Sequence, residues 1–418
     1  MNLELARGKD SADPLKEYRG RFFHGDENLI YLNGNSLGRL PMASLERMNQ
    51  LVAYEWGERL IRGWKEGWYT ASKRAGDLIA ELIGAKPHEV IVSDSTSVNL
   101  FKLALSALLY QKCRSDIVSD SLNFPSDLYV FQSALEAVGR KGELLLARSQ
   151  DEITVEADVI ENTLSEKTAL LSLSHVAYKS GFMYDLPQIT KIAHRNGAMM
   201  LWDLSHAVGA VPISLNEANV EMAVGCTYKY LNGGPGAPAF LYVREDLIEK
   251  LVNPIAGWFG HENSFAFEED YRPSGGIERF LVGTPPVLSL EAMHASLEVS
   301  REAGIAAIRR KSLAQTDYLL ELWRTRLRPL GVSLNSPEEP ASRGAHLAFS
   351  HPEGYRITQA LIHEKNTILD FRAPDTIRFG IAPLYNSHED IFVAVCHLEE
   401  VLTEKRYERY EVQGLGVT

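Results

Sequence analysis

The sequence of 418 residues has few cysteines and no long apolar run. Its three cysteines, Cys113, Cys226 and Cys396, are too few and too far apart for a disulfide framework or a CxxC zinc site. No apolar run reaches the roughly 18 residues of a membrane-spanning helix, and the first ten residues lack the apolar centre of a signal peptide. No HExxH pair is present among the 12 histidines. We therefore expect a cytoplasmic protein with no membrane partner and no metal.

Basic residues are also in deficit. The chain has 43 Lys and Arg against 55 Asp and Glu, a net charge of −12. This balance argues against a nucleic-acid partner, because no excess of cations is available to follow a phosphate backbone. With 45% hydrophobic and 23% charged residues, the composition is that of a globular protein rather than a disordered chain.

Short β-rich runs alternate with helical stretches between about residues 85 and 245. Strands are predicted at residues 89–93, 116–118, 142–147, 169–173, 198–202, 222–225 and 239–243. Helices are predicted at residues 98–110, 127–138 (capped by Ser126) and 186–195 (ended by Asn196 and Gly197). Repeated β-α-β units predict an α/β fold with a mostly parallel sheet flanked by helices.

The composition changes near Thr284-Pro285-Pro286. Helical stretches at residues 287–303 and 306–328 follow, and then a short tail that mixes helices and strands. We expect residues 1–285 to form an N-terminal segment and a large domain, and residues 286–418 a smaller C-terminal α+β domain.

Residues 34–38, Gly-Asn-Ser-Leu-Gly, match the G-x-S-x-G nucleophile elbow of serine hydrolases. An elbow requires a strand, a sharp turn and a helix, but Pro41 interrupts the helix that should follow Ser36. The candidate partners Asp203 and His206 are only three residues apart, which suits a catalytic triad poorly. A tight Gly/Asn turn is favoured, and a hydrolase that uses Ser36 is kept as an alternative.

A second set of residues fits a pyridoxal phosphate (PLP) site. Asp203 ends an apolar strand, where open α/β sheets bind ligands. Lys229 follows another strand and precedes a glycine-rich loop, and Ser95-Thr96-Ser97 forms a strand-to-helix turn that suits a phosphate. A carboxylate for the pyridine nitrogen, a lysine for the aldehyde and a phosphate turn are what a protein supplies to PLP.

Five blocks of sequence resemble the signature blocks of the kynureninase family, over about residues 31–386. They are YLNGNSLG at residues 31–38, NFPSD at 123–127, WDLSH at 202–206, TYKYLN at 227–232 and GWFGH at 257–261. The resemblance implies the aminotransferase-like fold type I and PLP as cofactor. It also implies a homodimer with shared active sites, and hydrolysis of L-kynurenine to anthranilate and L-alanine, with 3-hydroxykynurenine as a possible substrate.

The same resemblance assigns roles to individual residues. Lys229 would hold the cofactor as a Schiff base, Asp203 would pair with the pyridine nitrogen, and Tyr228 would act as a proton donor. Other cofactor contacts would come from Thr96, Ser97, Phe124, Asp127, Ser174, His206 and Tyr228, and from the partner subunit through Trp258 and Thr284. Arg378 would bind the substrate α-carboxylate, and Ser36, Trp64 and His261 would line the side of the aryl ketone.

Two features bear on how far the resemblance extends. Thr284 stands where some relatives have an asparagine. Trp56 stands near the position at which animal relatives have a histidine, and this difference points to a preference for kynurenine over 3-hydroxykynurenine as substrate. A cysteine desulfurase or class V aminotransferase is the alternative within PLP enzymes. A desulfurase needs a cysteine in a mobile C-terminal loop, whereas Cys396 lies in a predicted helix at residues 390–402.

Overall fold

A computed structural model describes residues 2–411. Its largest sheet has seven strands in the order β2-β8-β7-β6-β5-β3-β4. Only β8 runs against its neighbours, so the predicted mostly parallel sheet is confirmed. The strands are β2 (Val90–Val92), β3 (Asp116–Asp120), β4 (Leu144–Ala147), β5 (Thr168–Ser174), β6 (Met199–Asp203), β7 (Met222–Gly225) and β8 (Phe240–Val243).

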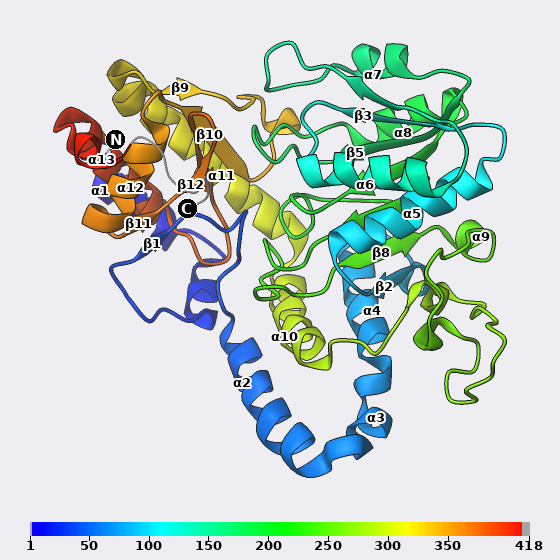
Figure 1. The fold of residues 1–418 in the computed structure, drawn as a ribbon. Helices are drawn as coiled ribbons and strands as arrows, with labels where there is room; N and C mark the ends of the chain where they lie inside the picture. The colour runs from blue at the N-terminus through cyan, green and yellow to red at the C-terminus, as the bar shows by residue number, and fades with distance from the viewer. Residues whose placement is uncertain (1, 412–418) are drawn as a thin grey trace.

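Helices cover both faces of this sheet (Figure 1). Alternate residues of β6 point to opposite faces: Met200 and Trp202 enter one apolar core, and Met199 and Leu201 enter another. The first core contains α4 (Ala71–Ile83), α8 (Leu186–Arg195) and α10 (Val287–Ala303), and the second contains α5 (Thr96–Tyr110) and α6 (Pro125–Ala137). A strand buried on both faces must be apolar throughout, which explains the sequence of β6. Two short helices, α7 (Ala157–Thr163) and α9 (Glu245–Ile248), complete this part.

A smaller unit combines residues from the N-terminal segment with the C-terminal elements of the described chain. Its antiparallel sheet has the order β12-β13-β10-β9, formed by β9 (Ser333–Leu334), β10 (His346–Ser350), β12 (Asp370–Arg372) and β13 (Thr376–Gly380). Around it lie α11 (Ile305–Leu322), α12 (Gly354–Lys365), α13 (His388–Thr403) and α1 (Leu3–Ser11), and β1 (Ile30–Tyr31) pairs with β11 (Thr367–Ile368). Ala6, Ile30 and Leu32 belong to the same apolar core as α13. The boundary at residues 285 and 286 stays a prediction, but α1 and β1 pack with the C-terminal elements.

Residues 42–70 form an arm whose first helix packs against α10 and whose tip extends away from both units in Figure 1. It consists of α2 (Met42–Gln50), a π-helical segment (Leu51–Arg59) and α3 (Gly63–Glu66). Arg47 of α2, and Arg74 of α4 just beyond the arm, both form ion pairs with Glu291 of α10. Large apolar side chains are exposed along its outer part: Val52, Tyr54, Trp56, Leu60 and Ile61.

One sequence prediction of a helix limit was wrong. Ser126 does not cap α6, because Pro125 occupies its first turn and the extended Phe124 precedes it. The stretch predicted at residues 306–328 is helical throughout, because α11 ends at Leu322 and is continued by a π-helical segment to Leu327 and a 3-10 turn to Leu330. The stop predicted at Asn196 and Gly197 is confirmed, since Gly197 has a φ of +70°. Among residues 2–411 no helix is both long and apolar enough to cross a membrane.

Candidate active site

The central residues of the site follow the carboxyl ends of neighbouring parallel strands. Asp203 is the last residue of β6, and its Oδ1 accepts a hydrogen bond of 2.8 Å from the Ser205 backbone N–H. Lys229 lies four residues after the end of β7. Both line a cavity of about 190 Å³ at this edge of the large sheet. The cavity therefore lies at the strand ends, which is where open α/β sheets bind ligands.

His206 lies directly beside the lysine. Both ring nitrogens of His206 are 3.3 Å from Lys229 Nζ. Burial, and then the charge of Lys229, lower the pKa of His206 well below its usual range. The imidazole is therefore neutral at physiological pH and can accept a hydrogen bond from the lysine.

Asp127 brings a second buried carboxyl group to the cavity. Burial, and then the neighbouring carboxylate of Asp203, raise the pKa of Asp127 well above its usual range. Its Oδ2 is buried and has no hydrogen-bond partner within residues 2–411. A buried polar oxygen without a partner is costly, so its position suits a polar group of a bound ligand.

Hydroxyl groups gather at the start of α5. Ser95 caps this helix by accepting from the Val98 N–H, so Thr96 and Ser97 occupy its first turn. Ser97 Oγ is 3.2 Å from Ser126 Oγ, which lies in the first turn of α6. A helix N-terminus with neighbouring hydroxyls favours an anion such as a phosphate.

Phe124 and Tyr178 supply aromatic surface to the same cavity. Their ring centroids are 5.2 Å apart in an edge-to-face arrangement, and Phe124 remains 45% exposed. An aromatic ring that is held in place but still open can stack on a planar ligand. The cavity therefore offers a lysine, a carboxylate, a phosphate turn and a stacking ring, which is a donor set that fits PLP.

The Gly-Asn-Ser-Leu-Gly sequence is a tight turn that packs against the lysine segment. The Gly38 N–H donates to the Tyr228 carbonyl oxygen at 2.8 Å. A side chain at Gly38 would lie 2.7 Å from Asn232 Cα, so only glycine permits this approach. Ser36 Oγ accepts from Arg378 Nη2 at 3.2 Å and thus serves an arginine rather than an imidazole. This arrangement leaves no support for the serine-hydrolase alternative.

Arg378 is held from several sides. It forms a buried ion pair with Asp370, and its Nη1 donates to the Tyr178 carbonyl oxygen. Burial lowers the pKa of Arg378, although the Asp370 carboxylate opposes this shift. The guanidinium lines the cavity that also contains Lys229.

The cavity also contains residues that the sequence did not point to: Asn35, Ser126, Tyr178, Ser205 and Arg372. The position of Arg372 could have been recognised in part from the sequence. It stands two residues after Asp370 in a short strand, so period-two geometry puts both side chains on one face. Its proximity to Arg378 additionally required the antiparallel pairing of β12 with β13.

Several predicted site residues lie elsewhere in the molecule. Trp64, Trp258 and Thr284 line a separate, mainly apolar cavity of about 880 Å³ beside the arm. Ser174 donates to Asn123 Oδ1 at 2.7 Å, and neither cavity includes it among its lining residues. His261 is buried, with its Nδ1 accepting from the Asn263 N–H at 2.9 Å. The exposed Trp56 lies on the arm.

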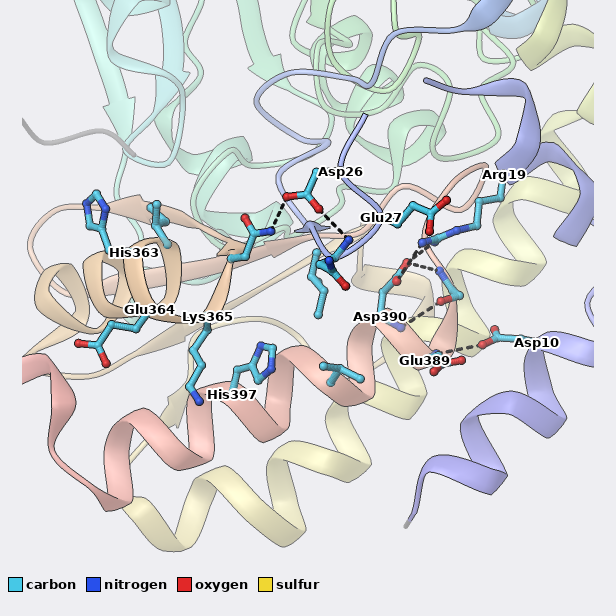
Figure 2. A pocket seen from close by; sticks show the side chains of 16 residues that line it. Asp10, Arg19, Asp26, Glu27, His363, Glu364, Lys365, Glu389, Asp390 and His397 are labelled. Carbon is cyan, nitrogen blue, oxygen red and sulfur yellow. Dashed lines mark hydrogen bonds and ion pairs between the residues drawn. The ribbon is translucent and has the colours of Figure 1, made fainter. Parts of the chain in front are cut away.

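A more voluminous cavity lies away from this chemistry, between α1, α12 and α13 (Figure 2). It measures about 1070 Å³ and is lined mainly by charged residues. Most of these already have partners: Asp390 pairs with Arg19, Asp26 accepts from Asn366 at 2.7 Å, and Lys365 pairs with Glu400. We interpret it as a solvated groove of ion pairs. Among residues 2–411 no group of three or more His, Cys, Asp or Glu side chains could hold a metal ion.

Solved structures with the same fold define the class. A cysteine desulfurase from Thermococcus onnurineus NA1 superposes with a TM-score of 0.79 at 20% identity, over 93% of this chain and 98% of that chain. The cysteine desulfurase CsdA from Escherichia coli also reaches 0.79, at 17% identity over 93% of this chain and 98% of its own. The fold is thus fold type I, the architecture of these desulfurases, as predicted.

Sequence comparison gives the family. A kynureninase from Pseudomonas fluorescens is 42% identical over 97% of this chain and 96% of its own length. One from Burkholderia mallei (strain SAVP1) is 42% identical over 96% and 95%. The family model described as "Kynureninase C-terminal domain" matches residues 308–398. The chain belongs to the kynureninase family, so the predicted family membership is confirmed.

Proposed function

We propose that this protein is a PLP-dependent kynureninase that hydrolyses L-kynurenine to anthranilate and L-alanine. The observation that carries the proposal is the grouping of Lys229, Asp203 and His206 with Arg378 around one cavity. The 42% identity to kynureninases over nearly the whole chain supports the same reaction. When bound, PLP supplies an aldehyde that reacts with amines and a ring that accepts electrons.

The residues around the cavity divide the work of holding the cofactor. Lys229 would bind the aldehyde, and the Asp203 carboxylate would hold a proton on the pyridine nitrogen. Thr96 and Ser97 would bind the phosphate at the start of α5, and Phe124 would stack on the ring. His206 and Asp127 would complete the polar surroundings. Ser174 would act indirectly, because the Asn123 Oδ1 to which it donates also accepts from the Phe124 N–H.

Proton transfer falls to two neighbouring residues. Lys229 would remove the proton from the substrate α-carbon, and water would add to the γ-carbonyl before the Cβ–Cγ bond breaks. Tyr228 would then protonate the β-carbon of the alanine fragment. The neighbouring Cys226 thiol, and then burial, raise the pKa of Tyr228, so its hydroxyl keeps the proton until it is needed.

The substrate carboxylate would bind at Arg378, which fixes the amino acid at one end of the cavity. Ser36, Trp64 and His261 are proposed for the side of the aryl ketone. In a single subunit only Ser36 of these lines the cavity with Lys229. The roles proposed for Trp64 and His261 therefore depend on the proposed dimer, in which they would reach the site of the partner subunit.

We further propose that the active protein is a homodimer with shared sites. Trp258 and Thr284 line an apolar cavity apart from Lys229, beside an arm whose outer side chains Trp56 and Ile61 are 55% and 77% exposed. Such a surface is typical of an interface. A second copy that covers it would bring Trp258 and Thr284 to the phosphate end of the opposite site. The compartment proposed from the composition is the cytoplasm.

The cysteine desulfurase alternative requires a nucleophilic cysteine in a mobile C-terminal loop, and the position of Cys396 does not meet this requirement. Cys396 lies within α13, is half-buried, and is 3.1 Å from Arg326 Nη1. Burial raises the pKa of this thiol, which disfavours the reactive thiolate. The predicted helical position of Cys396 is confirmed.

The first test measures cofactor and product together. The purified protein with PLP should be yellow and should form fluorescent anthranilate from L-kynurenine. Lys229→Ala should lose both the visible absorption band and turnover, whereas Lys250→Ala, at a lysine on the surface, should keep both. A Lys229→Ala protein that retains the band and the activity would overturn the proposal. The same assay with 3-hydroxykynurenine measures substrate preference.

A further inference from the structure

A second arginine lies next to the proposed carboxylate site. In the pairing of β12 with β13, Asp370 is opposite Arg378 and Arg372 is opposite Thr376. Side chains two apart in a strand share a face, and so do directly opposed residues of an antiparallel pair. Asp370, Arg372 and Arg378 therefore lie on one face of this sheet, and both arginines line the cavity that contains Lys229.

Arg378 has most of its donors engaged by the protein. Its Nε and Nη2 donate to Asp370, its Nη1 donates to the Tyr178 carbonyl oxygen, and Nη2 is also 3.2 Å from Ser36 Oγ. Its side chain is 1% exposed. An arginine held in this way is well oriented, but it has little capacity for a complete two-point contact with a ligand carboxylate.

Arg372 is held much more loosely. Its side chain is 23% exposed, and its Nη2 is 3.3 Å from Asp370 Oδ1 and 3.5 Å from Ser36 Oγ. Its Nη1 donates to the Phe371 carbonyl oxygen at 3.3 Å. Charge-assisted N–H···O hydrogen bonds are usually about 2.7–2.9 Å long. The guanidinium of Arg372 can therefore exchange these long contacts for shorter ones to a ligand.

The local charges and donors favour an anion at this point. Two guanidinium groups share the single carboxylate of Asp370, which leaves one positive charge to be balanced by a ligand. Ser36 Oγ accepts from both arginines, so its own proton can be donated. Asn35 also lines the cavity, is fully buried, and has no hydrogen-bond partner for either side-chain polar atom within residues 2–411.

We propose that Arg372 is a second substrate-binding arginine that grips the α-carboxylate of the amino acid together with Arg378. The firmly held Arg378 sets the orientation of the carboxylate, and the more loosely held Arg372 binds it from the cavity side. Asp370 positions both guanidinium groups. The Asn35 amide donates to the same carboxylate. This inference deepens the proposed function and rests on it for the identity of the substrate.

The test compares ligands with and without the carboxylate. The visible absorption band of the PLP-loaded protein is titrated with L-alanine, the proposed product, and with L-alaninamide, which lacks the negative charge. A lost hydrogen bond between charged groups weakens binding by about 10- to 100-fold. Arg372→Gln should therefore raise the Kd of L-alanine by about 10- to 100-fold and change that of L-alaninamide less than about threefold. Arg372→Lys should recover part of the loss, because it keeps the charge but not the planar fork.

Kinetics provide a second readout. KM for L-kynurenine should rise in Arg372→Gln by a similar factor while kcat changes little, since carboxylate binding is shared by ground state and transition state. Arg324→Gln is the matched control, because this arginine pairs with Glu338 at the surface and should leave both constants unchanged. An equal loss for L-alanine and L-alaninamide, or no loss for L-alanine, would overturn the assignment.

The two proposals fail in different ways. If the wild-type protein responds to L-alanine but does not cleave L-kynurenine, the proposed function is wrong, and the alanine and alaninamide comparison still decides the role of Arg372. If it cleaves L-kynurenine and Arg372→Gln binds both ligands as the wild type does, only the second arginine is wrong. A wild-type protein that responds to neither ligand contradicts the carboxylate site itself.

Discussion

The turn at residues 34–38 should tolerate no side chain at its second glycine. A Cβ added at Gly38 would lie 2.7 Å from Asn232 Cα and closer still to the carbonyl oxygen of Lys229. To reach 3.4 Å, the start of ordinary van der Waals contact, the turn must move about 0.7 Å away from Asn232 Cα and about 1 Å away from the Lys229 carbonyl oxygen. Neither obstacle is the mobile end of a side chain, so the backbone must move.

The expected costs follow from this displacement. Overpacking of a filled interior typically lowers the free energy of unfolding by about 1–3 kcal/mol, and we expect this loss for Gly38→Ala. The same shift moves Ser36 relative to Lys229. Because misplacement of reacting groups by about 1 Å can cost on the order of 100-fold in rate, kcat/KM for L-kynurenine should fall by about 10- to 100-fold.

Urea denaturation of the PLP-loaded protein measures the first effect, and anthranilate fluorescence measures the second. Gly8→Ala is the matched control, because a Cβ there meets nothing within 4 Å and Gly8 lies within α1. That substitution should leave activity unchanged and should raise stability slightly, since alanine favours a helix. If Gly38→Ala unfolds at the wild-type urea concentration with wild-type kcat/KM, the close approach of the turn to Lys229 is not required.

Two further predictions concern pH and the dimer. Burial raises the pKa of Asp120 to about 6 from 3.8, so its stabilising contribution is complete below pH 3.8 and is lost as the pH rises through about 6. The free energy of unfolding of the wild type, measured relative to that of Asp120→Asn, should therefore fall by about 3 kcal/mol between these pH values. Urea titrations at a series of pH values measure this difference, and a difference that stays constant across the range would contradict the prediction. Mixing inactive Lys229→Ala with Trp258→Ala subunits should restore about a quarter of wild-type activity if Trp258 serves the opposite site, because about half the dimers are hybrids with one intact site each. No recovery in subunit-exchange assays would place Trp258 in its own subunit's site.

Much of the large sheet could be predicted from the sequence because its strands are local signals. The apolar run that became β6 identified a strand buried on both faces, and Asp203 at its end marked the ligand edge. The Gly34 and Gly38 pair was correctly assigned to a turn. The sequence pattern could not predict which segment packs against that turn. This segment is the backbone around Lys229, nearly 200 residues later.

The errors arose where neighbouring residues overrode a propensity. Pro125 determined the start of α6, so the side chain of Ser126 was free to face Ser97 instead of capping the helix. Arg372 escaped notice because its relation to Arg378 exists only after β12 and β13 pair antiparallel. The arm at residues 42–70 is held by ion pairs between residues far apart in the sequence, such as that of Arg47 with Glu291.

The joining of the two chain ends in the smaller unit has a consequence for synthesis on the ribosome. The strands of the large sheet, β2 to β8, emerge well before the C-terminal strands, so this sheet can form while translation continues. Residues 30–36 must wait, because β1 pairs with β11 and Ser36 contacts Arg378, both made in the last part of the chain. The half of the pocket proposed to recognise the amino acid is thus assembled last, and a prematurely terminated chain would lack it.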